Sequence, residues 1–197
     1  MLLLEKVMKS IKFLSRRNSV IYDETENIVI KSFRTEKDYV SETKIYHVLN
    51  QKGFEKVPHI LMEDTVNKQL KLEYLHGETV LEAFEKLEKS GNIEGGTQLI
   101  LKVFDWLDKF YRTLNTGEDQ ELKGLTLGDI NLRNFIVIND EIYGVDFESC
   151  KERTYKEEKI EVMARILLYN PKDSEYKKKV VKNLLESISA SIHYIDD

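Results

Sequence analysis

The spacing of apolar residues changes once along this chain, and that change limits the folds open to it. Between residues 19 and 75, short runs rich in β-branched and aromatic residues predict strands, and one stretch over 36–51 has helical spacing. From about residue 80 onward the apolar residues recur at helical spacing, apart from a hairpin pattern at 135–145. A strand-rich part followed by a mainly helical part predicts an α+β fold.

The break in pattern near residues 76–79 predicts a domain boundary. We expect a first domain over residues 1–77, with a five-stranded antiparallel sheet and one helix, and a second, mainly helical domain over residues 78–197. A length of 197 residues fits two small lobes.

The charge balance and the cysteine content narrow the classes of function. Thirty basic against 35 acidic side chains give a net charge of -5, the wrong sign for a protein that neutralises phosphates over a whole face, so no nucleic acid partner is expected. The single cysteine, Cys150, cannot form an internal disulfide, and the four histidines lack zinc-ligand spacing. We therefore expect a reduced, cytoplasmic protein.

The first 17 residues are basic and allow two interpretations. Their opening apolar run is too short for a signal sequence or a transmembrane segment. Apolar residues at helical spacing among the lysines and arginines could make weak contact with an anionic membrane surface. The alternative is a first helix or strand with a solvated basic side.

Two charged residues in the first domain occupy positions typical of a core. Lys31 lies within an apolar strand pattern, and Glu42 lies on the apolar face of the predicted helix over residues 36–51. Since a buried charge needs a partner, one interpretation is that the two side chains form an ion pair, with the lysine placed to hold nucleotide phosphates. The other is that Lys31 extends to solvent at a strand edge.

A polar loop and a strand end in the second domain carry oxygen ligands. Asp129 and Asn134 lie five positions apart, and Asp146 follows Asn134 by twelve positions, after the predicted hairpin. If the hairpin folds back, the three side chains converge, and such hard oxygen donors suit Mg²⁺ with its substrate phosphates. An aspartate without a metal to bind can accept a hydroxyl proton. Taken singly, Asp129 and Asn134 also fit an Asx turn and a cap.

With these residues in view, the chain resembles the protein-kinase-like superfamily over about residues 19–150. The Gly-Asp and Asp-Phe-Glu sequences are most similar to the aminoglycoside and choline phosphotransferase branch. The trimmed second lobe looks like that of lipopolysaccharide-core kinases or RIO-type kinases. The motifs that carry the resemblance, in chain order, are Val-Ile-Lys31, the helical Glu42, Leu-Glu-Tyr-Leu at 72–75, Gly-Asp-x-x-x-x-Asn at 128–134 and Asp146-Phe-Glu.

The resemblance implies a two-lobed kinase-like fold, an ATP and Mg²⁺ requirement, and a role for each matching residue. Asp129 would be the catalytic base, Asn134 and Asp146 would hold Mg²⁺, and Lys31, oriented by Glu42, would steady the nucleotide phosphates. Leu72 would lie at the back of the adenine pocket, with the backbone of Glu73 and Leu75 at the adenine edge. Arg133 would steady the transferring phosphoryl group or an acidic acceptor, or else form a salt bridge with a nearby acid.

The implied activity is transfer of the γ-phosphoryl group of ATP to a hydroxyl of a small molecule or a cell-envelope glycan. A minimal atypical serine/threonine protein kinase is one alternative. A non-catalytic nucleotide-binding pseudokinase is another, because Leu127 replaces a bracing histidine and no glycine precedes Gly53. The segment expected to cover the phosphates is Ser15-Arg16-Arg17-Asn18, whose arginines could supply charge in place of glycine amides.

Overall fold

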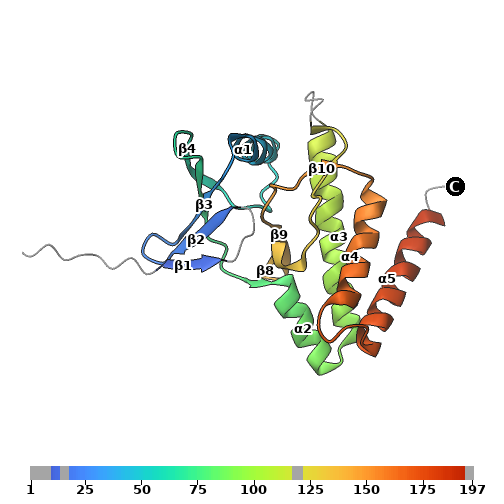
Figure 1. The fold of residues 1–197 in the computed structure, drawn as a ribbon. Coiled ribbons are helices and arrows are strands. Elements are labelled where there is room, and N and C mark those ends of the chain that lie inside the picture. The colour runs from blue at the N-terminus through green and yellow to red at the C-terminus, as the bar shows by residue number, and fades with distance from the viewer. Residues whose placement is uncertain (1–9, 14–17, 117–121, 194–197) are drawn as a thin grey trace, which may run out of the picture. The chain divides into compact units, whose positions relative to one another are not determined.

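The structure is a computed structural model that describes residues 10–13, 18–116 and 122–193 (Figure 1). The chain divides into two compact units, Met1–His76 and Gly77–Asp197, and the division falls one residue before the predicted boundary. Among the described residues, no helix combines the length and apolar character needed to cross a membrane.

The first unit is built on a five-stranded antiparallel sheet in the order β1-β2-β3-β5-β4. The register of β3 and β5 places Lys31 opposite Leu70 and Val29 opposite Leu72, so the buried leucines and Lys31 share one face of the sheet. The strands are β1 (Ser10–Phe13), β2 (Ser19–Asp23), β3 (Ile28–Ser32), β4 (Ile60–Asp64) and β5 (Gln69–Glu73).

One helix, α1 (Glu36–Gln51), accompanies this sheet (Figure 1). The helix begins where the hydroxyl of Thr35 accepts a hydrogen bond from the Asp38 amide, as an N-cap does. Its apolar face is buried through Tyr39, Ile45 and Leu49, and Glu42 lies on that same face. The bounds predicted for this helix are those observed.

The second unit consists mainly of four helices, α2 (Val80–Ser90), α3 (Ile93–Asn115), α4 (Tyr155–Leu168) and α5 (Glu175–His193). The long helix α3 contacts the other three (Figure 1). Helix α3 begins at Ile93, with the Asn92 side chain accepting from the Gly95 amide, although Gly95 and Gly96 lie near its start. A cap of this kind overrides the low helix propensity of the two glycines.

Short strands complete the second unit and position its loops. The hairpin of β8 (Phe135–Ile138) and β9 (Glu141–Gly144) pairs with β6 (Glu78–Thr79). A second pairing joins β7 (Leu125–Thr126) to β10 (Lys151–Glu152). Phe147, between the hairpin and β10, stacks on Phe110 of α3 at a centroid distance of 5.5 Å, which anchors this segment in the core.

A buried lysine ties the start of α5 to the rest of the second unit. The ammonium of Lys177 lies 2.8 Å from a carboxylate oxygen of Glu88 on α2 and donates to the carbonyls of Tyr169 and Pro171. These three acceptors match the three donors of an ammonium group, so the charge is fully hydrogen bonded although its side chain is 1% exposed. The cation therefore joins α2, α5 and the loop that follows α4.

The fold class expected from the sequence is confirmed: an α+β protein with a five-stranded antiparallel sheet and one helix, followed by a mainly helical, reduced second part.

Candidate functional site

Lys31 and Glu42 form a buried ion pair in the first unit. The Lys31 ammonium donates to Glu42 Oε2 at 2.6 Å, and the two side chains are 5% and 0% exposed. The lysine also lies 5.2 Å from the centroid of the Phe33 ring, a cation–π contact. The ion pair predicted from the sequence is therefore present, and Lys31 does not extend to solvent. Its part in nucleotide binding stays a prediction.

The segment at the end of β5 contains the three residues predicted to surround an adenine. Leu72 is buried in the sheet between Val29 and Ile60. The amide of Glu73 donates to the His59 carbonyl at 2.9 Å, and Glu73 pairs with Ile28 of β3. Leu75 follows the strand and is half-buried.

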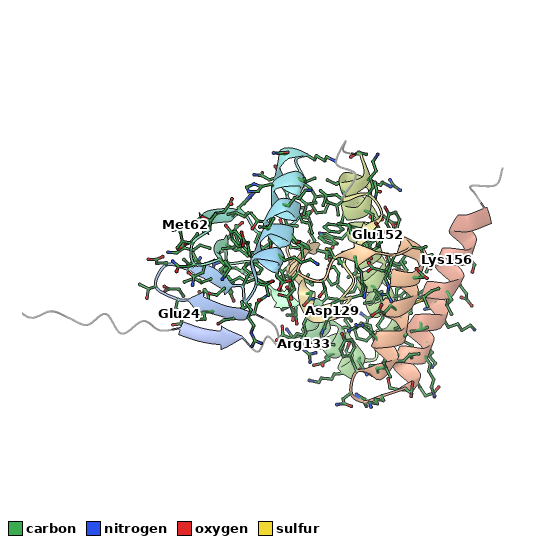
Figure 2. The ribbon with its side chains drawn as sticks, turned by 45° about the horizontal axis from the view of Figure 1, so that its top comes forward. Glu24, Met62, Asp129, Arg133, Glu152 and Lys156 are labelled. Atoms are coloured by element: carbon green, nitrogen blue, oxygen red, sulfur yellow. The ribbon has the colours of Figure 1, made fainter. Side chains whose placement is uncertain are left out.

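In the second unit, the loop from Gly128 to Asn134 is closed on itself by short-range hydrogen bonds. The carbonyl of Asp129 accepts from the Asn131 amide at 3.1 Å and from the Asn134 side-chain amide at 3.3 Å. A 3-10 turn over Leu132–Asn134 leads directly into β8. The carboxyl group of Asp129 is left at the surface, with 48% of its side chain exposed, and Arg133 follows in the same loop (Figure 2).

The hairpin brings the Asp146 segment back beside this loop. Phe135 pairs with Gly144, and one step further the Val145 amide donates to the Asn134 carbonyl at 2.9 Å. Asp146 then adopts a left-handed backbone conformation with φ of 69°, which aspartate tolerates better than most residues. Asn134 and Asp146 are therefore on adjacent strand ends within the second unit.

The donor chemistry of this loop pair fits a hard divalent cation. Carboxylate oxygens of Asp146 and Glu148 lie within 4.8 Å of each other. The Asn134 side chain uses its NH₂ group toward the Asp129 carbonyl, which leaves the amide oxygen as its acceptor. Proteins bind Mg²⁺ through a small number of such oxygens, and the ion keeps several waters and binds substrate phosphates. The assignment of Asn134 and Asp146 as metal ligands stays a prediction.

A buried glutamate on α4, which sequence reasoning missed, holds the start of the Asp129 loop. Glu158 is fully buried and accepts hydrogen bonds from the amides of Leu127 at 3.2 Å and Gly128 at 2.7 Å. The hydroxyl of Tyr111 donates to the same carboxylate. Burial and the adjacent carboxylate raise the pKa of Tyr111, so its phenol stays protonated as a donor. The sequence does carry a signal for this residue, because Glu158 is a charged residue on the same helix face as the apolar Val162 and Ile166.

Two further residues missed by sequence reasoning reach the loop from α4 and its end. Arg165 Nη2 lies 3.0 Å from Asp129 Oδ1. The hydroxyl of Tyr169 accepts from the Leu132 amide at 3.1 Å and donates to Asn131 Oδ1 at 3.0 Å. No spacing in the sequence predicts these contacts, because they join segments more than 35 positions apart.

Substitution of Gly128 tests how closely this loop packs against the Ser149 backbone. Its φ is +72°, and a Cβ there would lie 2.0 Å from the Ser149 carbonyl oxygen. We expect Gly128→Ala to lower the free energy of unfolding by more than about 1 kcal/mol, measured by chemical denaturation. Gly124→Ala is the matched control, since Gly124 also has positive φ, +74°, but open space at its Cβ position. Equal losses in the two variants would show that the Ser149 contact is unimportant.

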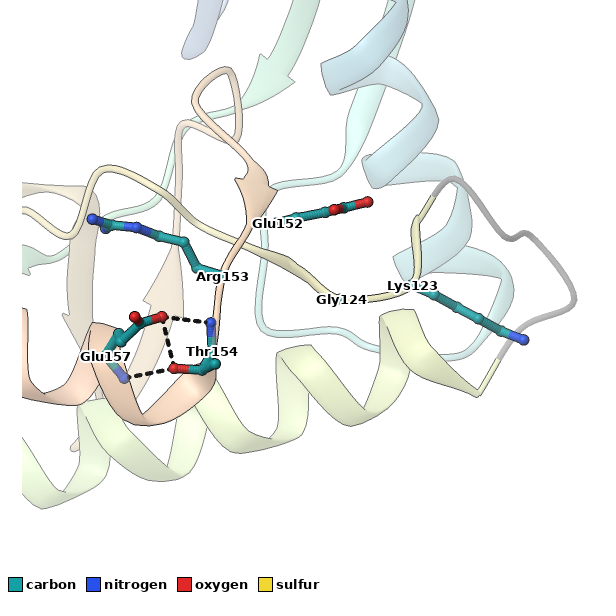
Figure 3. Close-up of a pocket in the computed structure, with 6 residues that line it drawn as sticks. All are labelled: Lys123, Gly124, Glu152, Arg153, Thr154 and Glu157. Carbon is teal, nitrogen blue, oxygen red and sulfur yellow. Dashed lines mark hydrogen bonds between the residues drawn. The ribbon is translucent and has the colours of Figure 1, made fainter.

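An open surface hollow in the second unit contains none of the predicted site residues. Its lining includes the N-cap of α4, where Thr154 and Glu157 exchange backbone and side-chain hydrogen bonds (Figure 3). Because Glu157 is hydrogen bonded within that cap, the polar side chains at this hollow have a structural role.

The segment predicted to cover the phosphates is described only in part. Arg16 and Arg17 lie outside the described residues. Asn18 is buried, and its side chain accepts from the Arg34 amide at 3.0 Å.

Comparison with known proteins identifies the class of fold. A scan against protein-family models finds no match, and neither does a search of curated proteins. Solved structures do match, and they show a likeness of fold at low sequence identity.

One of these structures is the ternary complex of streptomycin, ATP and the aminoglycoside phosphotransferase APH(2″)-IIa. It is 13% identical to this chain with a TM-score of 0.51, over 90% of this chain and 78% of that one.

Proposed function

We propose that this chain is an ATP-dependent phosphotransferase that transfers the γ-phosphoryl group to a hydroxyl of a small molecule or a cell-envelope glycan. The observation that carries the proposal is the Lys31–Glu42 pair within a kinase-like fold. Burying both charges is expensive and adds little net stability, so such a pair fits a binding function better than a purely structural one.

In the first unit, the lysine ammonium would bind nucleotide phosphates while Glu42 fixes its position. The carbonyl of Glu73 and the amide of Leu75 would meet the adenine edge, and Leu72 would form the apolar back of that pocket. Backbone groups suffice for these contacts, which makes the side chains at 73 and 75 replaceable.

In the second unit, Asp129 would accept the proton of the acceptor hydroxyl. The hydroxyl oxygen forms the new P–O bond as the bond between the γ-phosphorus and the β–γ bridging oxygen breaks, and its electron pair leaves with ADP. Asn134 and Asp146 would hold Mg²⁺, which when bound neutralises charge on the phosphates. Arg133 would bind anionic oxygens near Asp129.

The buried Leu127 does not weaken this proposal. Its side chain is 3% exposed, and its amide is held by Glu158. The loop is therefore braced through the backbone without a histidine at position 127.

The first experiment is calorimetric titration of the full chain with Mg-ATP and with ATP plus EDTA, followed by transfer from radiolabelled ATP to sugars, amino-alcohols and glycans. Binding that depends on Mg²⁺, with label on an added acceptor, supports the proposal. Label on the chain itself would favour a protein kinase. Binding without turnover on any acceptor would favour a pseudokinase, and no binding would reject nucleotide chemistry altogether.

The role of the lysine can be separated from its effect on stability. Lys31→Met alone removes the ammonium from which the buried Glu42 accepts, so we expect it to lower the free energy of unfolding by about 3–5 kcal/mol. The double variant Lys31→Met/Glu42→Met removes both charges and should restore most of that stability. We expect its affinity for Mg-ATP, measured by calorimetry, to fall about 10- to 100-fold.

The matched control is Lys71→Met on β5, whose ammonium lies 3.6 Å from Glu26 and is partly exposed. Its affinity for Mg-ATP should be unchanged. A double variant that folds and binds Mg-ATP like the unmodified chain would contradict the role of Lys31.

A further inference from the structure

Tyr169 fixes the part of the loop that carries Arg133. Its hydroxyl bridges the Leu132 amide and the Asn131 side chain, and Asn131 Oδ1 also accepts from the Arg133 amide at 3.0 Å. Burial raises the pKa of Tyr169, which keeps the phenol protonated for this bridge. The backbone at Arg133 is therefore held to the end of α4.

The guanidinium of Arg133 is held over the same tyrosine. It lies 5.9 Å from the centroid of the Tyr169 ring, at an exposed position. It forms no salt bridge with any residue that the structure describes, so a structural ion pair does not account for this arginine. Its charge does act on Glu82, but that carboxylate is already hydrogen bonded to the amide and hydroxyl of Thr79.

Arg165 adds a second guanidinium beside Asp129. It is anchored by Glu161, which accepts from Arg165 Nε at 3.0 Å and from Arg153 Nη1 at 2.6 Å. The charges of Arg133, Arg165 and Asp129 all act on the Tyr169 phenol. Arg165 is paired with Asp129 and Glu161, whereas Arg133 has no such carboxylate partner among the described residues.

We propose that the acceptor is anionic: a hydroxyl compound whose phosphate or carboxylate group binds Arg133, with Arg165 beside it, while its hydroxyl meets Asp129. This inference rests on the proposed phosphotransferase function. A guanidinium presents parallel N–H donors that match such oxyanions, and its position over the Tyr169 ring helps to preorganise it. A cationic acceptor would face two guanidiniums and be repelled. The transferring phosphoryl group of ATP is the other source of an anion for Arg133.

The test uses matched acceptors and radiolabelled ATP with the full chain. Glycerol 3-phosphate is compared with glycerol, and glucuronate with glucose; we expect transfer to favour the anionic member of each pair. Arg133→Gln should raise KM for the anionic acceptor about 10- to 100-fold with KM for ATP within about twofold. Arg133→Lys should recover only part of this loss because it lacks the planar fork. Arg112→Gln, at an exposed arginine of α3, is the control and should change neither constant.

Each contrary outcome identifies what is wrong. A rise in KM for ATP alone would assign Arg133 to the transferring phosphoryl group, and equal use of neutral acceptors would overturn the inference while the proposed function stands. Binding is tested without turnover by NMR, through shifts of the Asn131 and Arg133 amides on addition of glycerol 3-phosphate or glucuronate. No shift with either probe overturns the inference. Shifts that Arg133→Gln abolishes, without transfer, count against the proposed function only.

Discussion

We expect Asp129→Asn to lower the turnover number about 10²- to 10⁴-fold if Asp129 is the proposed base, because asparagine cannot accept the proton of the attacking hydroxyl. Hydrogen bonds that close the loop fix the position of this carboxylate, and its side chain is 48% exposed, so a hydroxyl compound can reach it. Steady-state transfer from ATP to an accepted hydroxyl compound measures the loss. Affinity for Mg-ATP, measured by calorimetry, should change little.

The matched control is Asp105→Asn on α3, where the carboxylate is 76% exposed and lies 3.7 Å from Lys109. This variant should retain full turnover. If Asp129→Asn is as active as Asp105→Asn, then Asp129 is not the base, whatever the acceptor.

Glu158→Ala should lower the free energy of unfolding by about 3–5 kcal/mol. The change strands two buried amides, of Leu127 and Gly128, and the buried hydroxyl of Tyr111, and each stranded group costs about 1–3 kcal/mol. Chemical denaturation followed by circular dichroism measures the loss. Glu158→Gln keeps an acceptor oxygen and should lose less.

An exposed glutamate provides the comparison. Glu175→Ala removes a surface pair with Lys178 on α5 and should leave the free energy of unfolding nearly unchanged. A loss for Glu158→Ala as small as that would mean that solvent replaces the carboxylate in holding the loop.

Much of the fold could be predicted because its elements carry strong local signals. The helix over residues 36–51 has a Thr35 cap and a clear apolar face, and it was predicted with the observed bounds. The two-residue strands β6, β7 and β10 were missed, since their pairing depends on partners 25 or more positions away.

The Lys31–Glu42 pair could be predicted for a different reason: each residue alone is a charge on an apolar face, and burial forces the two to meet. Glu158 carries the same signal, since it shares the buried face of α4 with Val162 and Ile166. Arg165 and Tyr169 carry no such signal. Both are compatible with a solvated helix end; Arg165 meets the loop from α4, and the path of the chain after Leu168 brings Tyr169 to it.

Lys177 connects α5 to the segment that holds the Asp129 loop. One ammonium holds the segment after α4 by the carbonyls of Tyr169 and Pro171, and Tyr169 in turn holds Asn131 and Leu132. A single cation with three directional hydrogen bonds thus connects α5, through Tyr169, to the loop that carries Asp129. A substitution on α5 at Lys177 could therefore shift a loop that it does not touch.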